Sequence, residues 1–131
     1  MRPAPATTSR DGLSASASDF TLEPSVTTLP AGAGRPFTFR ITNAARQTVT
    51  RFDRDHTQLL HLYLIRSDLT GFAHLHPSMS PGGTWSVLLP ALSPGNWRVY
   101  NQFITPGQDG RPVALVLSTP LTVPGRPGTT P

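Results

Sequence analysis

The chain has 131 residues, of which 11 are basic, 7 are acidic and none is cysteine, and its formal net charge is +4. One domain of ordinary size accounts for this length, with a compact part of roughly 105 residues. Without cysteine the protein cannot form disulfides, thiolate zinc sites, iron–sulfur clusters or a blue-copper centre, so imidazole, carboxylate and thioether groups are the ligands left for a metal.

The N-terminal segment, residues 1–18, is rich in Ala, Ser, Thr and Pro and lacks the apolar middle of a signal peptide. We interpret it as a flexible tether of the kind that follows a cleaved signal or a membrane anchor, which predicts an extracytoplasmic location, either periplasmic, secreted or at the cell surface. No apolar run reaches the roughly 18 residues needed to cross a membrane, so no membrane insertion is expected. The basic residues are all arginines and are spread along the whole chain. Without interleaved aromatic residues they predict no nucleic-acid partner.

Short apolar runs separated by 15 prolines and 11 glycines predict a series of strands after this segment. Residues 20–24 alternate apolar and polar side chains and predict a first edge strand that ends at Pro24. Residues 36–43 show the clearest period of two, and residues 48–52 are expected to form a third strand.

A long fourth strand is predicted at residues 58–66, because apolar residues occur there on both faces. A turn over residues 67–71 leads into a short strand at residues 72–77. Within the long strand, Leu60, Leu62 and Leu64 share one face, and His61, Tyr63 and Ile65 share the other. Three more strands are expected at residues 84–89, 96–103 and 112–123.

This pattern predicts an all-β fold, an immunoglobulin-like (cupredoxin-like) antiparallel β-sandwich of about 7–8 strands. We expect the sandwich domain to span residues 19–124 and a flexible tail to occupy residues 125–131, which can bury no apolar face. The predicted core is made of inward-facing strand residues: Phe37, Phe39, Ile41, Leu62, Leu64, Trp85, Val87, Trp97, Val99 and Leu115.

Four histidines lie between positions 56 and 76 and are the main candidates for chemistry. His74 and His76 are two residues apart, so on a strand they share a face, roughly 7 Å apart, and both imidazoles can converge on one ion. His61 lies on the preceding strand, and the register of the hairpin decides whether it joins them. Imidazole nitrogens that converge within about 4 Å favour a metal site, whereas splayed rings favour a structural role.

Other residues nearby are candidate donors with structural alternatives. Asp68 is a weak ligand, an acceptor that fixes a ring tautomer, or a turn cap. His56 and Met79 are candidate additional ligands, but a loop histidine is often incidental and a methionine often covers a core edge. The histidine pattern itself is also explained by a strand end and a hydrogen-bonded core histidine. For a metal we favour a copper ion, with zinc as the alternative, since histidine-only sites suit both.

The stretch from Leu60 to Pro77, followed by Gly83-Thr-Trp85 and Pro94-Gly-Asn-Trp-Arg98, resembles the YtkA-like and CopC-like immunoglobulin-type domains of bacterial exported proteins. The resemblance covers about residues 20–123. Its specific part is the central stretch with His61, Asp68, His74 and His76. The resemblance implies a periplasmic or cell-surface domain with a role in copper handling.

We therefore predict an extracytoplasmic, non-catalytic metal-binding module that holds copper through His61, His74 and His76. No catalytic residues are predicted, because the sequence has no nucleophile elbow, no paired glutamates and no glycine-rich phosphate loop. The alternative is an interaction or structural domain of the cell envelope with no metal site, in which an edge strand binds an envelope protein.

Overall fold

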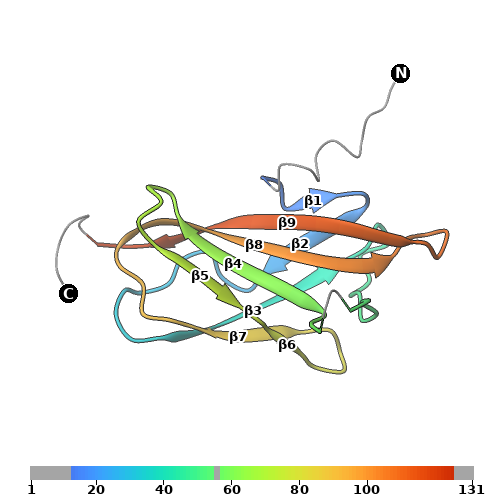
Figure 1. Cartoon of the computed structure of the whole chain (residues 1–131), viewed down its shortest axis with the longest axis horizontal. Helices are drawn as coiled ribbons and strands as arrows, with labels where there is room; N and C mark the ends of the chain where they lie inside the picture. The colour runs from blue at the N-terminus through green and yellow to red at the C-terminus, as the bar shows by residue number, and fades with distance from the viewer. Residues whose placement is uncertain (1–12, 55–56, 126–131) are drawn as a thin grey trace, which may run out of the picture.

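The protein is a sandwich of two antiparallel sheets, as predicted, in a computed structural model that describes residues 13–54 and 57–125. One sheet has the strand order β1-β2-β3-β7-β6 and the other β5-β4-β8-β9 (Figure 1). No helix in the described residues is long and apolar enough to cross a membrane. The strands are β1 (Ser16–Ala17), β2 (Phe20–Pro24), β3 (Arg35–Thr42), β4 (Leu60–Arg66), β5 (Phe72–Leu75), β6 (Ser78–Met79), β7 (Trp85–Leu89), β8 (Gly95–Pro106) and β9 (Pro112–Val123).

The hydrophobic core lies between the two sheets and is rich in aromatic side chains. Phe39 stacks on Trp85 with ring centroids 6.2 Å apart. Phe52 meets Trp85 and Phe103 edge-on, at 5.1 Å and 5.6 Å, and so links the two sheets. All the predicted core residues are buried except Val87, which is partly buried and packs against the core.

Strand β4 lies between β5 and β8 (Figure 1). One of its faces is apolar and is buried in this core. Leu60, Leu62 and Leu64 are almost completely buried, as the alternation predicts. The other face of β4, with His61 and Tyr63, is therefore the outer face of the four-stranded sheet. His61 is nevertheless only 8% exposed.

The prediction of a third strand at residues 48–52 is wrong. In this described segment Thr48 forms an isolated bridge to Thr42 in one sheet, and Asp53 forms one to Ile104 in the other. The segment thus crosses from sheet to sheet and cannot follow one strand as a neighbour. Its apolar residues are three apart, a spacing that does not alternate.

The predicted N-terminal boundary also needs correction. Ser16–Ala17 pairs with β2, so β1 and not β2 is the edge strand there. Ala17 is buried, and the carbonyl of Ser14 accepts a hydrogen bond from the amide of Ser118 at 2.9 Å. The folded part therefore includes residues assigned to the tether, because Ala17 adds apolar surface to the core. The rest of the predicted tether, residues 1–12, and most of the tail, residues 126–131, lie outside the described residues.

Strand β5 ends earlier than predicted, before Pro77. The chain then moves to the other sheet, where β6 pairs with β7. Proline has no N–H to continue a ladder, which fits the end of pairing at this point. His76 therefore lies at the crossover between the sheets, one residue beyond β5.

Candidate metal centre

The hairpin formed by β4 and β5 places three histidines on one outer face. Its register pairs Tyr63 with His74 and Leu62 with Leu75. Residues opposite each other in an antiparallel ladder share a face, so His74 lies on the side of the sheet that carries His61 and Tyr63. His76 follows two residues later on that face and comes next to His61, with ring centroids 5.2 Å apart.

The three imidazoles form a compact group. Nδ1 of His61 lies 3.2 Å from Nε2 of His74, within hydrogen-bonding distance. The rings of His74 and His76 have centroids 4.9 Å apart. One ligand atom from each of the three histidines can be chosen so that all lie within 4.8 Å of one another. The closest pair thus meets the expected separation of about 4 Å, and the whole group is slightly wider.

These separations fit the ligand shell of a small metal ion. With metal–nitrogen bonds of about 2.0–2.1 Å, two ligands of a tetrahedral ion lie about 3.3 Å apart. The 3.2 Å between His61 and His74 already matches this value. His76 is exposed and follows the end of β5, so its side chain has room for the final adjustment. Three imidazoles leave one coordination position open in a tetrahedral ion.

The surroundings of His74 favour its neutral form. The pKa of His74 is lowered below its usual value of 6.5, first by desolvation and then by the positive charges of His76 and His61 when these are protonated. The side chain is exposed as a whole, but its ring lies against the rings of its neighbours, which removes water from part of its surface. A neutral imidazole is the form that binds a metal.

A tyrosine supports the group from the same face. The ring of Tyr63 stacks on that of His74, with centroids 4.4 Å apart and planes at 18°. The Tyr63 hydroxyl donates a hydrogen bond to Oε1 of Gln102 at 3.4 Å. Gln102 lies opposite His61 in the β4–β8 ladder. Sequence reasoning placed Tyr63 on the face of His61 but gave it no role, and nothing in the sequence pointed to Gln102, because its position depends on strand register.

Asp68 does not belong to the group, which corrects its predicted role at the metal. It lies in the turn of the β4–β5 hairpin, where Oδ1 accepts hydrogen bonds from the backbone and the hydroxyl of Thr70, at 3.1 Å and 2.6 Å. Its other oxygen forms an ion pair with Arg66. These contacts lower the pKa of Asp68 to about 2, the Thr70 hydroxyl having the largest effect. Asp68 therefore acts as the cap of the hairpin turn, which was one of its predicted alternatives.

The two additional candidates have different outcomes. Met79 pairs with Trp85 in the other sheet and is partly buried against the core, which supports the alternative that it covers a core edge. His56 lies outside the described residues.

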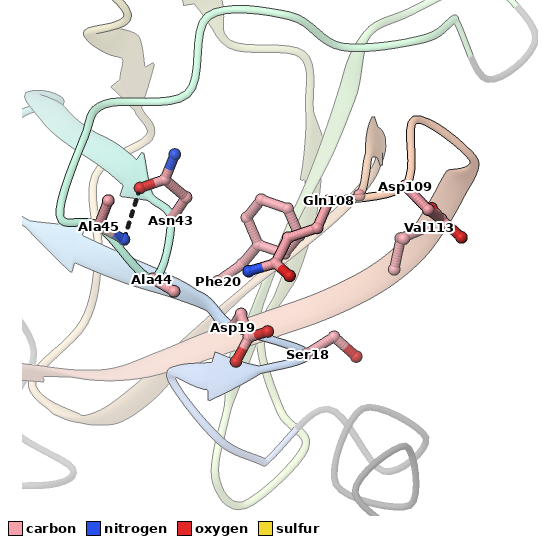
Figure 2. A pocket seen from close by; sticks show the side chains of 10 residues that line it. Ser18, Asp19, Phe20, Asn43, Ala44, Ala45, Gln108, Asp109 and Val113 are labelled. Carbon is pink, nitrogen blue, oxygen red and sulfur yellow. Dashed lines mark hydrogen bonds between the residues drawn. The ribbon is translucent and has the colours of Figure 1, made fainter.

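A pocket of about 410 Å³ occurs elsewhere in the molecule, between the β1–β2 turn, the loop after β3 and the β8–β9 turn (Figure 2). Asp19 and Gln108 line it, together with the ring of Phe20, and none of the histidines in the described residues does. One of its polar groups already has a hydrogen-bond partner nearby, because Oδ1 of Asn43 accepts a hydrogen bond from the amide of Ala45 at 2.9 Å. The pocket offers no set of groups comparable to the histidines.

Comparison with protein families finds that residues 14–119 match a family described as a domain of unknown function (DUF8832). The chain belongs to the DUF8832 family. The matched region contains the whole β4–β5 hairpin and so includes all three histidines of the group. A search of curated proteins gives no match. The family description assigns no function to the domain.

Proposed function

We propose that the protein is a non-catalytic, extracytoplasmic metal-binding module that holds a copper ion through His61, His74 and His76. The observation that carries the proposal is the convergence of three imidazoles from two neighbouring strands, with ligand atoms within 4.8 Å of one another. Here two of them are already as close as two ligands of one ion.

Copper is favoured by the donor set. An all-nitrogen site binds Cu(II) more tightly than the other divalent first-row metals, zinc included. The chain has no cysteine, so it offers no thiolate that would favour zinc. The resemblance to YtkA-like and CopC-like exported domains supports both copper and an extracytoplasmic address. Zinc is the alternative metal.

The exposed location of the histidine group on the sheet surface supports a metal-binding role over a catalytic one. His74 and His76 are exposed, and the group lies on an outer sheet face. Enzymes that use a metal commonly place it in a cleft that excludes water. A metal held on an open face is accessible to a second protein, as transfer of the ion requires.

An interaction domain without a metal is the second candidate. Strand β5 is at the edge of its sheet, and Phe72 on this strand is 66% exposed. An exposed edge with a large aromatic residue is a favourable place for a partner strand. In this case the contact between His61 and His74 would serve only to hold the hairpin together.

A metal titration distinguishes the two functions. We expect the wild-type protein to bind one equivalent of Cu(II) at about pH 7.5, where imidazoles are mostly neutral. Binding should raise the free energy of unfolding by about 2.7 kcal/mol at a hundredfold excess of copper over its dissociation constant. His76→Ala should remove most of both effects, because it deletes one of the three ligands while the exposed position leaves the core intact.

Met79→Leu is the matched control. It removes the thioether and keeps the apolar volume, so copper binding should be unchanged if Met79 belongs to the core edge. Equal copper binding by the wild type and His76→Ala, or none by either, would favour the interaction domain. A parallel titration with Zn(II) identifies the preferred metal.

A further inference from the structure

We infer that Tyr63 is a positioning residue that holds the His74 imidazole in its metal-binding orientation. The inference rests on the proposed function, since it assigns a role within the same site. It concerns a residue that contributes no ligand atom to the histidine group. The stack of the two rings, 4.4 Å apart and nearly parallel, is the contact that carries it.

His74 needs such support because, apart from its contacts with His61 and His76, little else restricts its side chain. The side chain is exposed, and β5, at the edge of the sheet, has only one neighbouring strand. An exposed imidazole on an edge strand samples several rotamers, and binding a metal then costs the entropy of choosing one. A ring that already lies in place binds with less of this cost.

The position of Tyr63 restricts the histidine in the required way. Tyr63 covers one face of the His74 ring, and a ring stacked in this manner can present a nitrogen only at its edge. That edge is turned towards the buried His61, as the 3.2 Å between Nε2 of His74 and Nδ1 of His61 shows. Stacking therefore fixes the plane of the ring while leaving its metal-binding nitrogen accessible.

Tyr63 is itself held on both sides. Its hydroxyl donates to Gln102 on β8, and its ring lies 6.3 Å from that of Phe72 on β5. It is partly buried on the central strand β4, between β5 and β8. The tyrosine therefore links the middle of the sheet to the exposed imidazole at its edge.

The test compares Tyr63→Leu, Tyr63→Phe and Tyr100→Leu with the wild type. Tyr100 is the matched control, because it is the cross-strand partner of Tyr63 on the same outer face and is also partly buried. No ring contact joins Tyr100 to a histidine of the described residues. Affinity is measured by Cu(II) titration, and the number of coordinating nitrogens by the nitrogen hyperfine pattern in electron paramagnetic resonance.

Tyr63→Leu should weaken Cu(II) binding about tenfold, the usual effect of losing a group that orients a ligand, and its spectrum should show fewer coordinated nitrogens at subsaturating copper. Tyr63→Phe keeps the stack and should restore wild-type affinity to within about threefold. Tyr100→Leu should leave both readouts unchanged. A merely structural role for Tyr63 would lower stability without changing the nitrogen pattern.

Two results overturn the inference alone. One is a Tyr63→Leu protein with wild-type affinity and spectrum. The other is an equal loss in Tyr63→Leu and Tyr100→Leu, which would reflect general damage to the sheet. A wild-type protein that binds no copper and no zinc overturns the proposed function itself, and is distinguished from the other results by the first titration.

Discussion

Gly71 packs its backbone directly against the indole of Trp97. A Cβ atom built on residue 71 would lie 2.9 Å from Cζ3 of that indole, closer than real Cβ atoms approach other atoms. Trp97 cannot easily move away, because it is buried and its Nε1 donates a hydrogen bond to the carbonyl of Ser93 at 3.0 Å. The end of the β4–β5 turn is thereby fixed against the body of the sheet.

Gly71→Ala should therefore lower the free energy of unfolding by about 1–3 kcal/mol, the usual cost of forcing a methyl group into a packed site. Gly82→Ala is the matched control, since nothing lies within 4 Å of a Cβ there. It should leave stability unchanged or raise it slightly. Denaturant unfolding of both variants gives the answer, and equal stabilities would contradict the close contact with Trp97.

Leu69 in the same hairpin turn adopts a left-handed backbone conformation, with φ of 66°. Leucine is strained in this region, whereas asparagine tolerates it. Because Leu69 is 81% exposed, replacing it sacrifices little buried surface. Leu69→Asn should raise the free energy of unfolding by about 0.5–1 kcal/mol.

Leu88→Asn is the control for this gain, because Leu88 is also exposed, at 68%, but lies in strand β7. Asparagine is unfavourable in strands, so this variant should be less stable than the wild type. Thermal unfolding compares the two. A gain in both variants would mean that lower surface hydrophobicity, and not relief of the turn, is responsible.

Asp68 makes the stability of the hairpin depend on pH. Its pKa falls from 3.8 to about 2 in the folded protein, through the Thr70 hydroxyl and then Arg66. A depressed folded-state pKa means that the charged carboxylate stabilises the fold above pH 3.8 and that this stabilisation is lost as the pH falls towards about 2. Asp68→Asn keeps an oxygen acceptor for Thr70 but removes the charge.

The difference in stability between the wild type and Asp68→Asn should thus be largest near neutral pH and should shrink as the pH falls from 3.8 through about 2. Urea unfolding at several pH values measures it, and the other carboxyl groups cancel because both proteins share them. A difference that stays constant down to the lowest pH would show that the charge of Asp68 contributes nothing to folding.

The sandwich was predictable wherever one face of a strand is buried. Phe37, Phe39 and Ile41 alternate with polar residues because only their side of β3 meets the core. The segment around Phe52 was not, since it crosses between sheets and its phenyl ring fills the space between Trp85 and Phe103. Such a role leaves no periodic signal in the sequence.

The candidate site was predictable only in part for a related reason. A period of two guarantees that His74 and His76 share a face of any strand. Whether His61 reaches them depends on the register that pairs Tyr63 with His74. A loop of five residues between Arg66 and Phe72 is compatible with more than one register, and the left-handed Leu69 that helps to set it has no sequence signature.

Copper binding should depend on pH in a direction that follows from the imidazoles. Protons compete with metal for each ring, so an imidazole with the reference pKa of about 6.5 becomes roughly tenfold less available between about pH 7.5 and 5.5. The pKa of His74 is lowered by desolvation and by its histidine neighbours, so this ring stays neutral further into the acid range. The affinity for Cu(II) should therefore fall on acidification, but by less than three independent reference imidazoles would give. In the metal-free protein the lowered pKa of His74 also makes the free energy of unfolding depend on pH. Below pH 6.5 the unfolded chain takes up a proton that His74 in the folded protein resists, so the free energy of unfolding decreases as the pH falls.

Copper titrations at both pH values test the affinity, and a nuclear magnetic resonance titration of the His74 ring should give a midpoint below 6.5. Copper affinity that is unchanged at the lower pH would show that the metal is not held by imidazoles.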